Sequence, residues 1–274
     1  MMKRGSVGVF DSGFGGIAIL KEIEKCLPSY RYIYLGDTAR TPYGTRSMEV
    51  VHQFTLEGID FLFRQGCELV IVACNTASAD ALRKIQRKYL PNNYPDRRVL
   101  GVVVPLVEEA LAVTQNGRVG VLATEGTVRS NKYPRELEKL SGGACVFQQA
   151  APLLVPLVEE GEHHTKAAEL ILRKYLAPLR AKRIDTLLLA CTHYGHLESQ
   201  VKKEMGKKVN VVPAGKVVAR KLKEYLLRHP EIESRLSHSK SVTFYTTDLT
   251  EKFRRVGAKL YGHPITPKKA VLGG

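Results

Sequence analysis

The sequence lacks features that define several classes of protein. No run approaches the roughly 18 to 20 consecutive apolar residues that a membrane-spanning helix needs. The N-terminus passes directly into a strand-like segment at 7–10, without the apolar stretch and small-residue cleavage site of a signal peptide. Low-complexity segments are absent as well. We therefore expect a cytoplasmic protein that makes no membrane contact.

Cysteine is scarce, with five residues at irregular spacing and no Cys-x-x-Cys pair. This pattern does not fit a disulfide framework or a zinc site of four thiolates. Cys191 and His193 form a Cys-x-His pair without further spaced ligands, so no metal is expected. Cys26, Cys67 and Cys145 lie in ordinary helix or strand contexts, and we predict that they are small core residues.

Nucleotide-binding motifs are incomplete. Segment 11–16, Asp-Ser-Gly-Phe-Gly-Gly, follows the first predicted strand but continues into neither a P-loop nor a full Gly-x-Gly-x-x-Gly motif. Its glycines suit a tight strand-to-helix turn, in which Asp11 or Ser12 either caps the helix or belongs to a site. The position at a strand's carboxyl end favours a site, because open α/β sheets bind ligands there.

The net charge is +15, from 42 basic and 27 acidic residues. Such an excess is typical of proteins that bind nucleic acid or another polyanion. The basic residues are scattered, however, with groups at 83–88, 202–208 and 220–223 that we interpret as solvated helix faces. A non-catalytic basic module that binds nucleic acid or protein is the alternative function of a different class.

Strand-like and helical segments alternate along the chain. The predicted strands are 7–10, 32–35, 69–73, 99–103, 118–123, 144–148, 186–190, 208–212 and 241–246. Amphipathic helices are predicted between many of them, among them 47–64, 78–89, 165–179 and 216–228. This alternation predicts an α/β fold with mostly parallel sheets. The breaker-rich stretch 89–95 indicates a domain boundary.

Two cysteines occur in matching surroundings. Cys74 ends the apolar run 70–73 and Cys191 ends the run 187–190, and small polar residues follow each thiol. An apolar run bounded in this way predicts a buried parallel strand followed by a turn into a helix. Each thiol is then expected at a strand's carboxyl end beside a helix N-terminus, which lowers a thiol's pKa. Two such thiols suggest chemistry on both faces of one substrate.

The remaining polar segments are less specific. Loop 34–44 and segment 122–127 follow predicted strands, so each is either a turn or helix cap or part of the same site. His163 and His164 complete no ligand spacing, and His196 is predicted to be a surface or turn residue together with His52, His229, His238 and His263.

Taken together, the motifs resemble the glutamate racemases of the aspartate/glutamate racemase superfamily. The resemblance extends nearly from end to end and rests on segments 10–16, 36–44, 73–77, 156–159, 191–194 and 244–248. It implies two similar α/β domains, one formed by 1–97 plus 212–274 and the other by 98–211, with the active site in the cleft between them. It also implies a cofactor-independent isomerase that racemises L-glutamate to D-glutamate for peptidoglycan, and hence for cell-wall biogenesis and cell shape.

The resemblance also assigns roles to individual residues. Cys74, assisted by Asp11, acts on one face of the substrate, and Cys191, assisted by His193, acts on the other. Two opposed acid/base groups are the simpler solution for this reaction, because the α-proton leaves one face and another returns to the opposite face. The resemblance implies that substrate is held by Ser12, Tyr43, Gly44, Asn75, Thr76, Thr124 and Thr192, with the acidic Glu159 nearby.

Two segments depart from the family pattern. Gly195-His196 stands where Pro-Leu is frequent, and Pro213-Ala214-Gly215 replaces a segment that carries Asp or Ser. Aspartate racemase or another racemase of the superfamily is therefore the runner-up. The resemblance further implies a homodimer in part of the family, regulation by a cell-wall precursor in part, and DNA gyrase contact in some members.

Overall fold

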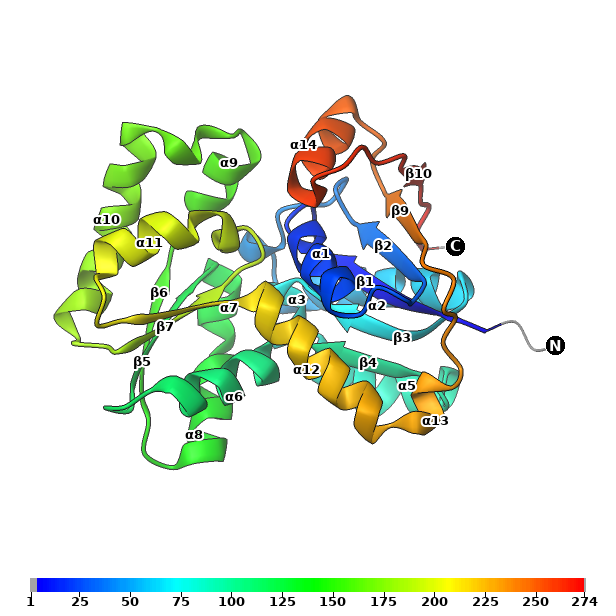
Figure 1. Cartoon of the computed structure of the whole chain (residues 1–274), viewed down its shortest axis with the longest axis horizontal. Coiled ribbons are helices and arrows are strands. Elements are labelled where there is room, and N and C mark those ends of the chain that lie inside the picture. Colours follow the sequence, from blue (N-terminus) through cyan, green and yellow to red (C-terminus); the bar gives the residue numbers. More distant parts are fainter. Residues whose placement is uncertain (1–3, 274) are drawn as a thin grey trace.

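The computed structural model describes residues 4–273. Their strands form two sheets, each flanked by helices (Figure 1). The strands are β1 Ser6–Asp11, β2 Tyr32–Gly36, β3 Cys67–Val72, β4 Arg98–Gly101, β5 Arg118–Ala123, β6 Cys145–Ala150, β7 Thr186–Ala190, β8 Asn210–Pro213, β9 Val242–Thr246 and β10 Lys268–Lys269. The larger sheet has the order β10-β9-β2-β1-β3-β4 and the smaller β6-β5-β7-β8. All pairings between these strands are parallel, which confirms the predicted α/β class.

Helices connect the strands and cover both sheets. They are α1 Gly16–Cys26, α2 Met48–Arg64, α3 Asn75–Asp80, α4 Leu82–Lys84, α5 Leu90–Asn93, α6 Val103–Val113, α7 Glu125–Ser130, α8 Lys132–Ser141, α9 Leu154–Glu159, α10 Lys166–Ala181, α11 Glu198–Met205, α12 Ala214–Arg228, α13 Pro230–Glu233 and α14 Glu251–Tyr261. The helix predicted at 78–89 instead begins at Asn75 and changes to a π-helical turn at Ile85–Tyr89. Its early start matters because Cys74 becomes the residue that precedes the helix.

The central strand of each sheet ends next to a segment that is predicted to belong to the site. β1 lies between β2 and β3, and β7 lies between β5 and β8. All residues of β1 and β7 are buried, as expected for strands covered by helices on both faces. Their carboxyl ends, at Asp11 and Ala190, lead directly into the segments predicted to carry the chemistry.

One apolar cluster runs through both halves of the molecule. It includes Ile71 of β3 and Val121 of β5, and it is continuous through Leu106 of α6 and Leu222 of α12. Because the two sheets share this core, the halves are held in a defined relative position by apolar burial. Figure 1 shows α12 passing from the four-stranded half to the six-stranded half.

The chain passes from one sheet to the other at positions that differ from the expected domain limits. β4 pairs with β3, so residues 98–101 belong to the six-stranded sheet although the expected division falls after residue 97. The breaker-rich stretch 89–95 is largely helical, with α5 inside it, and lies before β4. β8 pairs with β7, so residues 212 and 213 belong to the four-stranded sheet. The chain therefore crosses between the sheets after Gly101 and after Pro213.

None of the helices within residues 4–273 is both long and apolar enough to cross a bilayer.

Candidate active site

Asp11 is the last residue of β1 and is completely buried. Its Oδ2 accepts the Gly13 amide at 3.1 Å, and its Oδ1 accepts the Thr192 hydroxyl at 3.4 Å. Burial raises the pKa of Asp11, and the His193 charge and these hydrogen bonds oppose that rise only in part. Asp11 therefore binds a proton more tightly than an exposed carboxylate does, and it lies where β1 meets the segment after β7.

Cys74 immediately precedes α3 and is buried, with 6% of its surface exposed. The Ser12 hydroxyl and the Ala77 amide donate to its sulfur, and both hydrogen bonds lower its pKa. Burial and the negative charge of Asp11 outweigh them and raise the pKa of Cys74 to about 12. The lowered pKa expected from the helix N-terminus is thus not found at Cys74, because desolvation of a thiolate costs more than the amides return. Without substrate, Cys74 is a thiol.

Cys191 follows β7 directly, and its sulfur lies 3.7 Å from Nδ1 of His193. Nε2 of His193 lies 3.0 Å from Oε1 of Glu159, the last residue of α9. Burial would lower the pKa of His193, but the hydrogen bonds to Cys191 and Glu159 raise it to about 10. His193 is therefore an imidazolium at neutral pH, and it lies within contact of the Cys191 sulfur. This thiol has an acid/base partner of its own.

Hydroxyl groups from the two halves meet between the thiols. The Thr76 hydroxyl, in α3, lies 2.8 Å from that of Thr124, which precedes and caps α7. Thr127 contacts both, at 3.4 Å and 3.1 Å. Thr124 is thus a helix cap, as one of the two readings of segment 122–127 predicts, and its hydroxyl also contacts Thr76 of the other half.

Asn75 has a donor that no protein group uses. Its Oδ1 accepts the hydroxyl of the fully buried Tyr133 at 2.6 Å, which fixes the orientation of the amide. Its Nδ2 is buried and has no partner among the described residues. A buried donor without a partner is costly, so this atom is available for an acceptor on a ligand.

Tyr43 is predicted to hold substrate, but its hydroxyl is bound within the protein. Its side chain is buried, and its hydroxyl donates to Oδ2 of the buried Asp37 at 2.5 Å. The Thr247 hydroxyl donates to Oδ1 of Asp37 at 2.8 Å, so this carboxylate holds loop 37–44 against the end of β9. The Tyr43 hydroxyl is committed to this network, which leaves the backbone of Tyr43 and Gly44 as the part that can contact a ligand.

A cavity of about 250 Å³ adjoins these groups and is built from both halves of the chain. Its walls include Gly44 and Pro42 on one side and Thr124, Pro156 and Glu159 on the other. A Cβ atom at Gly44 would lie 2.9 Å from Cβ of Thr124, so glycine is needed where the two halves approach.

The structure brings the predicted site residues to one place. The contacts above join Asp11 and Ser12 of the first turn, Cys74 to Thr76, Thr124, Glu159, and Cys191 to His193. Asp37, Thr127 and Tyr133 were not among the predicted residues. The Gly-Asp-Thr and Thr-x-x-Thr segments contain the signal for two of them, whereas Tyr133 lies in an unremarkable helix, α8.

Other cysteine and histidine predictions had mixed outcomes. Cys67 is buried, and Cys26 is partly buried, but Cys145 is exposed at the start of edge strand β6, so its prediction as a core residue is wrong. His196 lies in the turn Tyr194–Leu197, in agreement with its prediction as a surface or turn residue, although its Nε2 is buried. His163 is buried. In the part of the chain that is described, no three His, Cys, Asp or Glu side chains are arranged to hold a metal ion.

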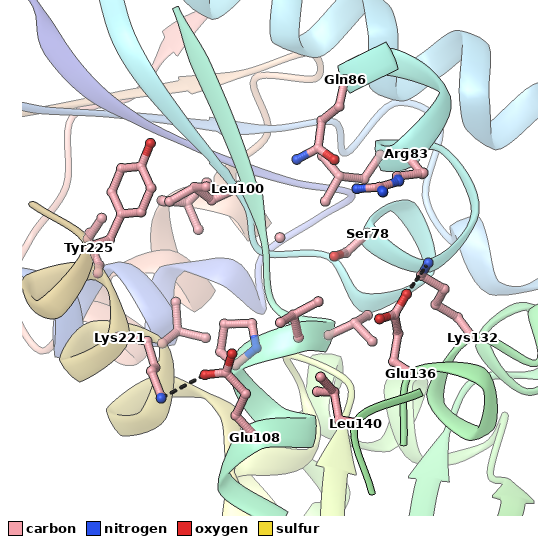
Figure 2. Close-up of a pocket in the computed structure, with 18 of the residues that line it drawn as sticks. Ser78, Arg83, Gln86, Leu100, Glu108, Lys132, Glu136, Leu140, Lys221 and Tyr225 are labelled. Carbon is pink, nitrogen blue, oxygen red and sulfur yellow. Dashed lines mark ion pairs between the residues drawn. The ribbon is translucent and has the colours of Figure 1, made fainter. Parts of the chain in front are cut away.

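A second cavity, of about 390 Å³, lies between β4 and helices α6, α8 and α12 (Figure 2). Figure 2 shows Glu108 paired with Lys221 and Glu136 paired with Lys132, each at 2.7 Å. None of the predicted site residues lines this cavity, so it is separate from the candidate active site.

Comparisons with known proteins identify the family of this chain. Residues 15–222 match the family model described as Asp/Glu/Hydantoin racemase. The fold is that of this class of isomerase, and the chain belongs to the Asp/Glu/hydantoin racemase family.

Within the family, the similar proteins are glutamate racemases. The chain is 42% identical to the glutamate racemase of Geobacter metallireducens over 94% of this chain and 93% of the relative. It is also 42% identical to that of Persephonella marina, over 97% of each chain. The crystal structure of glutamate racemase isoform RacE1 from Bacillus anthracis superposes with a TM-score of 0.90 at 33% identity, over 97% of both chains. The Francisella tularensis glutamate racemase in complex with D-glutamate superposes with a TM-score of 0.86 at 30% identity, over 98% of both.

Proposed function

We propose that this protein interconverts L- and D-glutamate by moving the α-proton between Cys74 and Cys191, without a cofactor. The observation that carries the proposal is the pairing of two buried thiols, one from each sheet, with separate proton partners. Asp11 lies beside Cys74, and the His193–Glu159 pair lies beside Cys191. The curated relatives and the solved structures that are glutamate racemases support glutamate as the substrate.

The two thiols begin in unequal states. Burial and the negative charge of Asp11 keep Cys74 protonated, whereas Cys191 lies beside the His193 imidazolium. In this state Cys191 removes the α-proton from one face, and Cys74 donates its proton to the other. After the transfer Cys191 is a thiol and Cys74 a thiolate, which is the state required for the opposite enantiomer. Asp11 and His193 take up or supply protons as the thiols change charge.

Substrate binding uses the donors between the thiols. The free Nδ2 of Asn75 is suited to a carboxylate oxygen, because its other amide atom is already bound to Tyr133. The hydroxyls of Thr76, Thr124 and Thr192 and the backbone at Tyr43 and Gly44 complete the set. Donors fixed in advance stabilise the developing carbanion without reorganisation, which is the main source of rate in such sites.

The wider role is the supply of D-glutamate for peptidoglycan in the cytoplasm, and therefore a contribution to cell-wall biogenesis and cell shape. This part of the proposal is supported by the relatives and by the absence, within residues 4–273, of a helix that could cross a bilayer. A homodimer and contact with nucleic acid or DNA gyrase are consistent with the resemblance and the basic charge. The charge alone supports the alternative of a non-catalytic module.

A circular-dichroism assay on L- and D-glutamate and on both aspartate enantiomers, run in heavy water, tests the proposal. We expect glutamate to racemise with solvent deuterium entering the α-carbon, and Cys74→Ala and Cys191→Ala to lose racemisation. Full activity in either variant, or racemisation without solvent exchange, would contradict the two-thiol scheme. Faster turnover of aspartate would favour the runner-up. Salt-dependent nucleic-acid binding with no turnover would favour the basic module.

A further inference from the structure

Two fully buried tyrosines lie behind the thiols, one in each half of the molecule. Tyr34 is in β2, next to β1, and Tyr194 begins the turn that follows Cys191. Both side chains are 0% exposed, so neither hydroxyl meets a substrate from the cleft. The two hydroxyls donate instead to backbone carbonyl groups that lie just beyond the carboxyl ends of strands. Neither tyrosine is among the residues expected to act on substrate or to hold it.

Tyr34 fixes the turn that follows β1. Its hydroxyl donates to the carbonyl of Gly13 at 2.8 Å, and the Gly13 amide donates to Oδ2 of Asp11. Ser12 immediately precedes Gly13, and the Ser12 hydroxyl donates to the sulfur of Cys74. The Tyr34 hydroxyl is therefore bound to the middle of the turn that supplies both the carboxylate and the hydroxyl group beside Cys74.

Tyr194 fixes the turn that carries the other thiol. Its amide donates to the carbonyl of Cys191 at 3.1 Å, and its hydroxyl donates to the carbonyl of Ala151 at 2.8 Å. The same carbonyl of Ala151 accepts the first amide of α9. Oε1 of Glu159, the last residue of α9, lies 3.0 Å from Nε2 of His193. One hydroxyl thus connects the turn after β7 to the helix that supplies the partner of the imidazole.

Both hydroxyls keep their protons, which distinguishes them from groups that exchange one. Burial raises the pKa of Tyr34 well above its usual value, and the charges of Asp11 and Cys74 raise it further. Burial and the charge of Cys191 raise the pKa of Tyr194 in the same way. A phenol that stays protonated is a permanent hydrogen-bond donor. Each tyrosine therefore orients its neighbours and takes no proton from a thiol.

We propose that Tyr34 and Tyr194 are positioning residues, each of which fixes the acid/base neighbours of one thiol through a hydrogen bond to the backbone. Tyr34 serves Cys74 through the turn after β1. Tyr194 serves Cys191 through the turn after β7 and through α9. The inference rests on the proposed racemase function and extends it. Loss of either hydroxyl takes a donor away from a buried carbonyl group, so the attached turn shifts and proton transfer at that thiol slows.

Rates alone do not show which thiol is affected. Enantiomers have equal free energies, so a variant must lower kcat/KM by the same factor in both directions. The isotope effect on kcat/KM with substrate deuterated at the α-carbon does show it, because each thiol removes the deuteron from one enantiomer only. Slower transfer at one thiol makes that step more rate-limiting. The isotope effect then rises for the enantiomer that this thiol deprotonates and falls for the other.

Tyr34→Phe and Tyr194→Phe are the test variants, measured with α-deuterated L-glutamate and D-glutamate separately. We expect each variant to lower kcat/KM by roughly tenfold to 10²-fold, because a displacement near 1 Å already costs the larger factor. Tyr194→Phe should show a larger isotope effect than Tyr34→Phe with one enantiomer and a smaller one with the other. Partial unfolding alone would lower the rate but leave both isotope effects at their wild-type values.

Tyr32→Phe is the matched control. Tyr32 lies in the same strand as Tyr34 and is 1% exposed. Its hydroxyl donates to the carbonyl of Leu27 at 2.6 Å, beyond the end of α1 that is remote from the turn after β1. This variant loses the same kind of buried hydrogen bond, and it should keep the wild-type kcat/KM and both wild-type isotope effects.

Isotope effects that do not differ between Tyr34→Phe and Tyr194→Phe would overturn the inference, and so would a difference in the same direction for both enantiomers. Equal changes in Tyr32→Phe would overturn it as well, since any buried tyrosine would then act alike. In those cases racemisation by the wild-type protein would still stand, so the proposed function would survive. A wild-type protein that racemises neither glutamate nor aspartate would overturn the proposed function and this inference together.

Discussion

The Thr192 hydroxyl donates to Oδ1 of Asp11 at 3.4 Å, and this contact joins the ends of two central strands from different sheets. Asp11 neighbours Cys74, whereas Thr192 follows Cys191 in the chain. The proton partner of one thiol is therefore connected to the segment that carries the other. A substitution at Asp11 or at Thr192 should therefore affect proton transfer at both Cys74 and Cys191.

Asp11→Asn should abolish most of the racemisation. The amide keeps the size of the side chain but cannot exchange a proton with Cys74, and general acid/base catalysis contributes roughly 10²- to 10⁴-fold. We expect a fall in kcat of that order, with little change in thermal midpoint. The exposed Asp96→Asn provides the control. Activity of Asp11→Asn within threefold of wild type would remove Asp11 from the mechanism.

Glu159→Gln should move the alkaline limb of the pH–rate profile to lower pH. Burial lowers the pKa of His193, and the partners Cys191 and Glu159 raise it to about 10, so loss of the Glu159 charge lowers it. An opposite charge at this range shifts a pKa by roughly one to three units. Glu160→Gln is the control, because Glu160 pairs with Lys252 instead. Coincident profiles for the two variants would refute the assigned partner.

The His193–Glu159 pair also predicts that the free energy of unfolding depends on pH. Since the pKa of His193 rises from 6.5 to about 10 in the folded protein, its contribution is fully present below about pH 6.5 and is lost as the pH rises through about 10. Urea unfolding at pH 6 and pH 10 should show wild type losing more stability over this interval than Glu159→Gln. Equal losses would show that the pair does not contribute to stability.

Tyr133→Phe should weaken substrate binding more than it slows the chemistry. The Tyr133 hydroxyl fixes Oδ1 of Asn75, and its loss leaves a buried acceptor unpaired at a cost of about 1–3 kcal/mol. We expect a lower free energy of unfolding and a higher KM with kcat less affected. Tyr175→Phe serves as the control, because its hydroxyl has no hydrogen bond within residues 4–273. A KM unchanged in Tyr133→Phe would contradict the role given to Asn75.

Gly15→Ala should damage the site without touching a reacting group. A Cβ atom there would lie 2.3 Å from Oγ1 of Thr192 and 2.9 Å from Nδ1 of His193. The imidazole must then move away from Cys191, and a displacement near 1 Å costs on the order of 10²-fold in rate. Gly143→Ala, where a Cβ atom would lie 3.9 Å from the carbonyl oxygen of Ser141, should have no effect on kcat. Comparable kcat values for both variants would show that the imidazole tolerates this crowding.

Much of the fold could be predicted because it follows from local pattern. The nine predicted strands correspond to β1–β9. Continuous apolar runs mark buried central strands such as β7, and interrupted runs mark partly exposed strands such as β6 and β9. The short strand β10 was missed, because Lys268 and Lys269 carry no apolar signal and pair only at the sheet edge. The sequence pattern also predicts too late a start for the helix at 78–89. The polar residues Asn75 and Thr76 resemble a turn, yet they lie in the first turn of α3, which is buried.

The sequence by itself determined the chemical groups of the site: two thiols, a carboxylate, an imidazole and several hydroxyls, each just after a buried strand. Tertiary structure alone decided their protonation states, because burial raises the pKa of Cys74 while Glu159, 34 residues before His193, raises that of the imidazole. It also decided that the Tyr43 hydroxyl belongs to Asp37 and that both departures from the family pattern line one cavity. Residue type and spacing are local properties, whereas desolvation and the choice of hydrogen-bond partner depend on segments that only folding brings into contact.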